Sequence, residues 1–157
     1  MTGHLVLSTL HTNSASETVG RLRDIGVESY LVASTVLGIM AQRLVRVLCP
    51  SCKQPYELPE RALQSIFPDR TSTAKLTLYR PKGCEACQGS GYWGRQGIYE
   101  LLVMTEPMRE LIHRNVPSAE IKEAAQKNGM KTLRESGLEL VFQGLTTLDE
   151  VFRNTVD

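Results

Sequence analysis

Four cysteines are the residues of this chain whose spacing indicates chemistry most clearly. They form two C-x-x-C pairs separated by 31 residues, Cys49 with Cys52 and Cys84 with Cys87. Two residues between thiolates let one tight turn direct both sulfurs at a single ion, and two such turns complete the tetrahedral four-sulfur site that Zn²⁺ prefers. Such a site has no open position for catalysis. The sequence therefore predicts a structural zinc site, with an insertion between the two pairs.

Three other interpretations of the cysteines stay open. A C-x-x-C pair can be a redox pair, although such pairs usually lie at a helix start. An iron–sulfur cluster uses the same four thiolates. The stretch CEACQGSG matches the C-x-x-C-x-G-x-G knuckle of J-domain co-chaperones, and on that view Tyr92 and Trp93 would belong to an exposed clamp. Those proteins carry several copies of the knuckle, whereas this chain has one.

Imidazole and hydroxyl side chains gather in a second stretch, GHLVLSTLHTNSA. Its apolar part, His4 to Leu10, predicts a buried strand, and Thr9 and His11 lie where that strand would end. Ligands bind at the carboxyl ends of strands in open parallel α/β sheets, so these side chains could sense the phosphate of a nucleotide. The alternative is that this stretch only caps the next helix. His4 and His11 are seven residues apart and would point to opposite faces of a strand, which argues against a shared metal ion.

The elements around these residues predict an α/β chain. After the strand, Ser14 and Glu17 form a capping box for a helix that ends near Gly26. A second helix is expected from Glu28 to Leu48, because apolar residues recur there at helical spacing. A strand followed by two helices is the tail of an α/β layer.

The rest of the chain predicts short elements. Between the cysteine pairs we expect a helix over residues 60–67 and a strand over residues 76–79, and after them a strand over residues 98–103. From Thr105 onward the sequence predicts short helices. The last two begin at capping boxes, Thr132 with Glu135 and Thr147 with Glu150.

Composition limits the classes of function. Eighteen basic and seventeen acidic residues leave a net charge of +1, which argues against nucleic acid as a partner. The longest apolar-leaning run, residues 30–41, is too short to cross a bilayer, and residues 1–10 lack the pattern of a signal peptide. A cytosolic, reducing location is therefore expected, where close cysteine pairs indicate metal before disulfides. A core strand so near Met1 suggests the C-terminal part of a longer protein.

Four stretches, GHLVLSTLHTNSA, RLRDIGV, AQRLVRVLCPSCK and GRQGIYELL, occur in this order and resemble the C-terminal part of the type II secretion and type IV pilus assembly ATPases. The resemblance covers residues 1–157. It implies the end of a RecA-like P-loop NTPase domain at residues 1–48, a tetracysteine zinc module at residues 49–97 and a small helical subdomain at residues 98–157.

The same resemblance implies a role and a set of partners. Members of this family are hexameric motors that bind and hydrolyse ATP in the cytoplasm and drive protein transport or pilus assembly at the inner membrane. The expected partners are other copies of the chain and the platform or cytoplasmic-domain proteins of the machinery, which would hold the motor at the membrane periphery. His4 and His11 would belong to the family's His box near the phosphates of the nucleotide, and Cys49, Cys52, Cys84 and Cys87 would bind zinc. From their place at the end of the expected strand, we expect Thr9 and His11 to contact the nucleotide.

The sequence departs from this family at the parts that phosphoryl transfer needs. The phosphate-binding loop, G-x4-GK[ST], is absent, and so are the acidic segments that hold Mg²⁺. We therefore expect no ATP hydrolysis by these 157 residues alone, with ATP and Mg²⁺ acting only in the full-length protein. Loss of zinc is expected to unfold residues 49–97 while the last helices persist.

Two further alternatives concern function. The chain could instead be a stand-alone zinc-dependent binding module, either a J-protein-like clamp or a zinc-ribbon nucleic-acid binder. Arg43 and Arg46, near the start of the zinc module, could contact a neighbouring subunit or simply lie on a solvated helix face.

Overall fold

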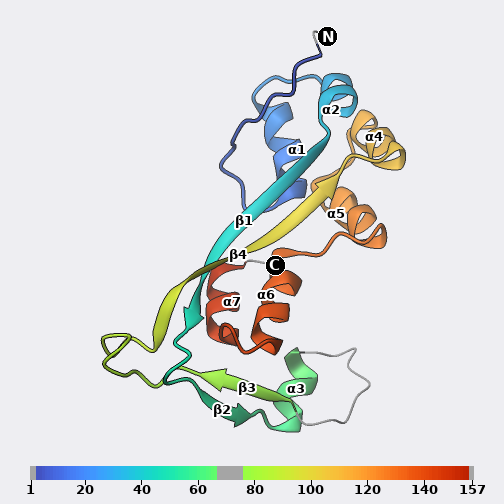
Figure 1. Cartoon of the computed structure of the whole chain (residues 1–157). Coiled ribbons are helices and arrows are strands. Elements are labelled where there is room, and N and C mark those ends of the chain that lie inside the picture. The colour runs from blue at the N-terminus through green and yellow to red at the C-terminus, as the bar shows by residue number, and fades with distance from the viewer. Residues whose placement is uncertain (1–2, 67–75, 156–157) are drawn as a thin grey trace. The chain divides into compact units, whose positions relative to one another are not determined.

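The computed structural model describes residues 3–66 and 76–155, which form both helices and strands (Figure 1). Among these residues, the first compact unit comprises residues 3–41 and 99–132, and the second comprises residues 42–66, 76–98 and 133–155. The mixed α/β class expected from the sequence is confirmed. The units are defined by packing and interleave along the chain, so the functional division at residues 48 and 97 stays a prediction.

The first unit is built from four helices. They are α1 (Ala15–Asp24), α2 (Ser29–Thr35), α4 (Glu106–His113) and α5 (Ser118–Lys127). Helix α2 packs on α4 and α1 packs on α5. The core side chains between them, Val19, Val32, Ile112 and Ile121, are almost completely buried.

Helix α1 begins and ends as the sequence predicts. The Ser14 side chain accepts a hydrogen bond from the backbone N–H of Glu17 at 3.2 Å, and the Glu17 carboxylate accepts one from the backbone N–H of Asn13 at 3.2 Å. These bonds satisfy amides that the first helical turn leaves without partners. Gly26 follows the helix with a φ of +94°, which suits a residue without a Cβ.

The second unit combines a small sheet with three helices. Strands β2 (Gln54–Glu57) and β3 (Thr77–Arg80) are antiparallel, and α3 (Glu60–Ile66) lies between them in the sequence. This is the insertion expected between the cysteine pairs; Phe67, the last residue of the expected helix, lies outside the described residues. Helices α6 (Leu133–Phe142) and α7 (Leu148–Asn154) complete the unit. Its apolar core contains Leu78, Val141, Leu148 and Val151.

Two long strands run through both units. Strand β1 (Gly38–Leu48) pairs with β4 (Tyr92–Val103), whose last half is the strand expected at residues 98–103. The expected helix from Glu28 to Leu48 is therefore wrong beyond α2. Apolar spacing alone does not distinguish a helix from a strand over this stretch, and pairing with β4, which comes much later in the sequence, makes it a strand.

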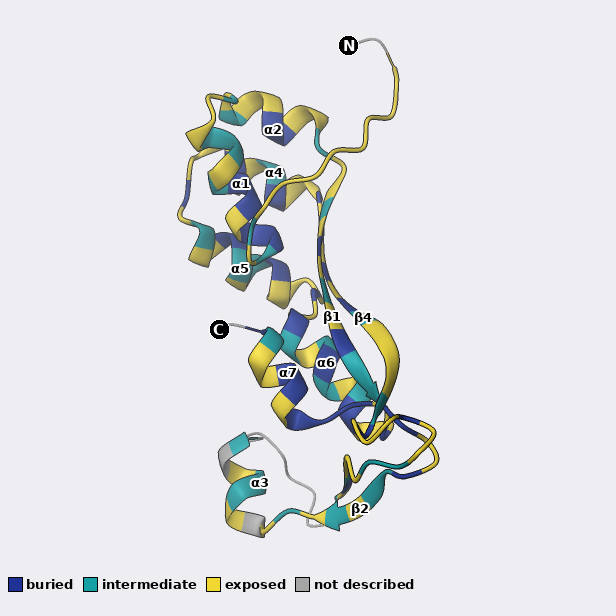
Figure 2. Cartoon of the chain, turned by 90° about the vertical axis from the view of Figure 1, so that its left-hand side faces the viewer, coloured by how far each residue is buried: buried dark blue, intermediate teal, exposed yellow. Residues whose placement is uncertain are grey.

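The strand expected from His4 to Leu10 is also absent from the described residues. Residues 3–12 have no regular secondary structure, and Leu5, Val6 and Leu7 are exposed by 74, 78 and 89% (Figure 2). A β-strand is defined by hydrogen bonds to a neighbouring strand, and an apolar pattern alone cannot supply the neighbour. No helix in the described part of the chain is long and apolar enough to cross a membrane.

Helices α6 and α7 approach closely at Gly137. A Cβ added there would lie 2.7 and 2.9 Å from the two methyl carbons of Val151, which is fully buried. We expect Gly137→Ala to lower the free energy of unfolding of the second unit by about 1–2 kcal/mol, because overpacking outweighs the gain in helix propensity. Denaturant unfolding followed by circular dichroism measures the change.

The matched control for this prediction is Gly20→Ala in α1. Its Cβ would meet only the end of the Arg23 side chain, at 3.9 Å. It should therefore stabilise the chain by up to about 1 kcal/mol. Equal stabilisation by both substitutions would contradict the close packing of α6 on α7.

Candidate metal centre and the histidine segment

Each cysteine pair lies in a tight turn beside the end of a long strand. The first turn follows β1, where the backbone N–H groups of Cys52 and Lys53 both donate to the carbonyl of Cys49. The second precedes β4, and it is closed by a bond from the Gly89 N–H to the Cys84 carbonyl at 2.9 Å. A bond of 2.9 Å from the Cys49 N–H to the Gly91 carbonyl joins the two turns. Backbone pairing therefore brings the turns together.

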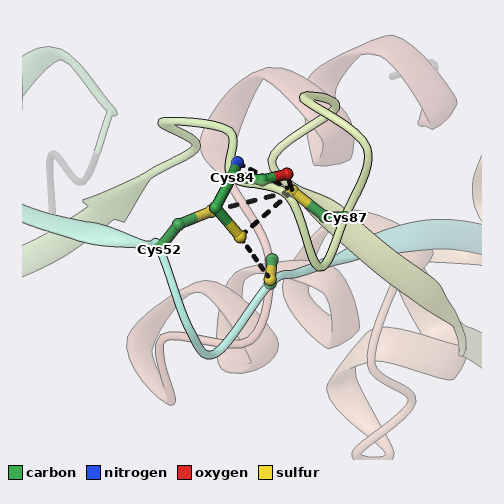
Figure 3. Close-up of side chains that lie close together, drawn as sticks. Cys52, Cys84 and Cys87 are labelled. Carbon is green, nitrogen blue, oxygen red and sulfur yellow. Dashed lines mark hydrogen bonds between the residues drawn. The ribbon is translucent and has the colours of Figure 1, made fainter.

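The four sulfur atoms converge on one point. All lie within 4.8 Å of one another, and Figure 3 shows Cys52, Cys84 and Cys87 directed at the same space. Three separations are 3.9 Å (Cys49–Cys84), 3.9 Å (Cys52–Cys87) and 3.7 Å (Cys84–Cys87). A regular tetrahedron of sulfurs around an ion at about 2.3 Å has edges of about 3.8 Å. None of the four cysteines is in a disulfide, and together they could hold one metal ion.

The surroundings of the sulfurs favour negative charge at Cys87. Burial raises the pKa of this thiol. The backbone N–H groups of Cys84 and Gly91, each 3.2 Å from its sulfur, lower the pKa, and so do hydrogen bonds from the neighbouring thiols. Together these hydrogen bonds outweigh burial and bring the pKa down to about 6. At Cys52, burial prevails and raises the pKa to about 11. A thiolate is the form that binds metal, and a cation would stabilise further thiolates beside it.

Gly91 has a conformation and a position that only glycine suits. Its φ is +74°, and an added Cβ would collide with Pro81. We expect Gly91→Ala to destabilise the second unit by at least about 2 kcal/mol, because backbone strain and steric overlap add. Denaturant unfolding followed through Trp93, the only tryptophan, measures this change.

Gly89→Ala is the control that separates the backbone strain of a positive φ from the steric overlap expected in Gly91→Ala. Gly89 has a nearly equal φ of +78°, but an added Cβ there would meet no atom within 4 Å. This control should cost only about 1 kcal/mol. A Gly91→Ala chain no less stable than Gly89→Ala would argue against the tight packing of the second turn.

The two aromatic residues after the second turn lie in different surroundings. Trp93 is 60% exposed. The Tyr92 ring instead stacks under the guanidinium of Arg46, 4.1 Å from the ring centre, and its hydroxyl lies 3.3 Å from the Thr147 hydroxyl. Tyr92 thus links β4 to the start of α7.

The two arginines near the first cysteine lie in β1, so a helix face is ruled out for them. Arg46 forms an ion pair of 2.5 Å with the buried carboxylate of Glu150, and its backbone N–H donates to the same carboxylate at 3.0 Å. Arg43 donates to the carbonyl of Gln42. A contact with a neighbouring subunit stays a prediction for both.

His4, Thr9 and His11 all lie in the exposed segment of residues 3–11. Just after these residues, the hydroxyls of Thr12 and Thr18 lie 2.7 Å apart at the start of α1. The nucleotide role of the histidines and Thr9 stays a prediction.

Glu100 is a buried acid that was not predicted from the sequence. Glu100 is 3% exposed, and its carboxylate accepts a hydrogen bond of 2.7 Å from the backbone N–H of Ala15, the first residue of α1. Negative charge is favourable at a helix N-terminus. A single acid inside the apolar run IYELLV was the available signal, but nothing local identifies a partner 85 residues away.

Comparison with known proteins places these features in a family. Residues 1–153 match the family model described as type II/IV secretion system protein. Type II secretion system protein E of Pseudomonas aeruginosa is 48% identical over 99% of this chain and 30% of its own length. Type II secretion system ATPase E of Vibrio cholerae is 46% identical over 99% of this chain and 30% of its own length. Type IV pilus assembly ATPase PilB of Pseudomonas aeruginosa is 48% identical over 99% of this chain and 27% of its own length.

The chain thus spans about 30% of the length of these relatives. The matched range includes residues of both compact units and the positions of all four cysteines. The chain belongs to the type II/IV secretion system protein family.

Proposed function

We propose that this chain is a part of an ATPase that powers type II protein secretion or type IV pilus assembly, and that it contributes a structural zinc site and nucleotide-sensing His-box residues. The observation that carries the proposal is sequence identity of 46 to 48% over nearly the whole chain to proteins named for these two machineries. The convergence of four sulfurs within the matched region supports the metal site.

The separations between sulfur atoms support zinc. Values of 3.7 to 3.9 Å match the edges of a tetrahedron around one Zn²⁺. A cluster of several irons would occupy the space between the cysteines and hold their sulfurs farther apart. Neither cysteine pair begins a helix, which is the usual setting of a redox C-x-x-C pair. Bound zinc would hold the two turns together and supply no catalytic step.

His11, His4 and Thr9 are the proposed nucleotide-sensing residues. Phosphoryl transfer needs a loop of backbone amides with a lysine and a carboxylate that holds Mg²⁺. The motif G-x4-GK[ST] does not occur in these 157 residues. ATP turnover is therefore proposed only for a full-length hexamer, together with membrane-platform or cytoplasmic-domain partners, and the isolated chain should show none.

The metal site is tested on the chain purified under reducing conditions. One zinc per chain is expected, and Co²⁺ substitution should give the absorption of a tetrahedral thiolate site. Absence of metal from a folded chain would refute the site. An iron–sulfur cluster would be recognised by its own absorption and by sulfide analysis.

The motor role is tested by chimaeras in Pseudomonas aeruginosa. Residues 1–157 replace the matching part of type II secretion system protein E in one strain and of PilB in another, since both are 48% identical to this chain. Restored secretion or restored piliation supports the role and distinguishes the two systems. His11→Ala should abolish activity in the chimaera without changing its zinc content. Two stable chimaeras without activity would contradict the proposal.

A further inference from the structure

The turn between α6 and α7, residues 143–147, contacts the chain on both sides of the first cysteine pair. Before the pair, the backbone N–H of Leu48 donates to the carbonyl of Leu145 at 2.7 Å. After it, the Lys53 ammonium donates to the carbonyl of Gly144 at 2.8 Å. The first cysteine turn is thus held at both ends by the α6–α7 turn.

Lys53 contacts a second partner at this place. Its ammonium lies 4.6 Å from the centre of the Tyr79 ring, in a cation–π arrangement. The same ring packs against Gly144, where an added Cβ would lie 2.8 Å from two ring carbons. One lysine, directly after a cysteine, therefore connects the cysteine site to β3 and to the α6–α7 turn.

The remaining residues of the turn extend these contacts. The Thr146 hydroxyl, fully buried, donates to the carbonyl of Arg46 at 2.7 Å. Thr147 approaches the Tyr92 hydroxyl and also caps α7 by accepting from the Glu150 N–H. The turn therefore touches both strands that lead into the cysteine site.

The turn is also continuous with the packing of the two helices. Its Gly144 and Leu145 N–H groups donate at 2.9 Å to the carbonyls of Val141 and Leu140 at the end of α6. Val141 and Val151 belong to the core of the second unit. A change in the position of the first cysteine turn would have to move these helices or break their hydrogen bonds.

We propose that metal binding at the four cysteines is coupled to the order of α6 and α7 through the α6–α7 turn, with Lys53 as the positioning residue that links them. This inference rests on the proposed metal site. It replaces the expectation that the last helices persist when zinc is lost. Coupling between two sites is reciprocal, so disturbing the helices must weaken metal binding by the same factor as metal loss loosens the helices.

The first test measures hydrogen exchange of the full 157-residue chain with bound Zn²⁺ and after chelation under reducing conditions. Chelation should increase exchange at residues 133–155 as well as at residues 48–53 and 83–92. Amides of α4 and α5, in the first unit, should be unchanged and provide the internal reference. Unchanged exchange at residues 133–155 after complete metal removal would overturn the coupling.

The second test asks whether Lys53 acts through its own contacts or only as a positive charge near the cysteines. Lys53→Met should lower Zn²⁺ affinity about tenfold, as loss of outer contacts of a metal site typically does, and should increase exchange at residues 133–155 in the metal-bound chain. Lys53→Arg should retain most of the affinity. Lys82→Met removes an exposed lysine two residues before Cys84 and should leave both measurements unchanged. Equal loss in Lys53→Met and Lys82→Met, or no loss in either, would overturn the proposed role of Lys53.

The reciprocal test uses one substitution in each unit. Val151→Ala in α7 and Val19→Ala in α1 both shorten a fully buried valine. Only Val151→Ala should weaken Zn²⁺ binding, measured by competition with a chromophoric chelator. Equal affinities in the two variants would contradict the coupling, whereas a wild-type chain that binds no metal would refute the metal site itself.

Discussion

Replacing Cys87 by serine is expected to abolish stable metal binding and to destabilise the second unit more than any other single substitution considered for this chain. Cys87 is buried, and its sulfur accepts hydrogen bonds from the N–H groups of Cys84 and Gly91. These bonds favour its thiolate, whereas a serine hydroxyl stays protonated at neutral pH and is a poor zinc ligand.

The size of this effect follows from metal-coupled folding. Zinc binding contributes an apparent 10–16 kcal/mol in finger peptides that fold only with metal. The second unit also has an apolar core of its own, built around Leu78 and Val141, so only part of that range should appear as lost stability. We expect a loss of several kcal/mol in the free energy of unfolding, measured by denaturant titration at saturating Zn²⁺.

Chelation provides the control for this substitution. A chelator should destabilise the wild-type chain by a similar amount and should have no further effect on Cys87→Ser. Unfolding of the first unit, followed through exchange of α1 and α4 amides, should be the same in both proteins. A Cys87→Ser chain that still holds one zinc with wild-type affinity would contradict the four-cysteine site.

Features determined by neighbouring residues could be predicted from the sequence. The C-x-x-C spacing places two sulfurs in one turn, and the capping residues Ser14 and Thr147 fix the starts of α1 and α7 through bonds to amides three residues away. The convergence of the two cysteine pairs could also be expected, because a four-sulfur site requires it.

Features that depend on distant partners could not be predicted. The stretch from Gly38 to Leu48 is a strand because β4 lies beside it, and the apolar stretch from His4 to Leu10 lacks such a neighbour among the described residues. The bond between Glu100 and Ala15 and the ion pair between Arg46 and Glu150 join residues 85 and 104 positions apart. Local spacing contains no information about these pairs.

The ion pair between Arg46 and Glu150 gives the second large prediction. Arg46→Met should lower the free energy of unfolding of the second unit by about 2–3 kcal/mol at neutral pH. Removing one partner of a buried pair costs about 3–5 kcal/mol, and the partial exposure of Arg46 reduces that value. Methionine keeps an apolar chain against Tyr92 but leaves the buried Glu150 carboxylate without its guanidinium. Arg43→Met, in the same strand, is the control and should cost less than about 1 kcal/mol.

The pH dependence of this difference identifies its cause. The hydrogen bond from the Arg46 guanidinium, opposed by burial and aided by the Arg46 N–H, lowers the pKa of Glu150 below its ordinary value. A carboxylate with a lowered pKa stabilises the fold above the pKa of the unfolded chain, about 4.3, and this stabilisation disappears as the pH falls through the folded value. Arg46 stays charged throughout this range, because an arginine is protonated at any pH near or below neutrality, and the same bond raises its pKa further. The difference between wild type and Arg46→Met should therefore be full at pH 7 and shrink below about pH 4. A difference that is constant between pH 7 and pH 3 would mean that Arg46 acts through packing on Tyr92 and not through its charge.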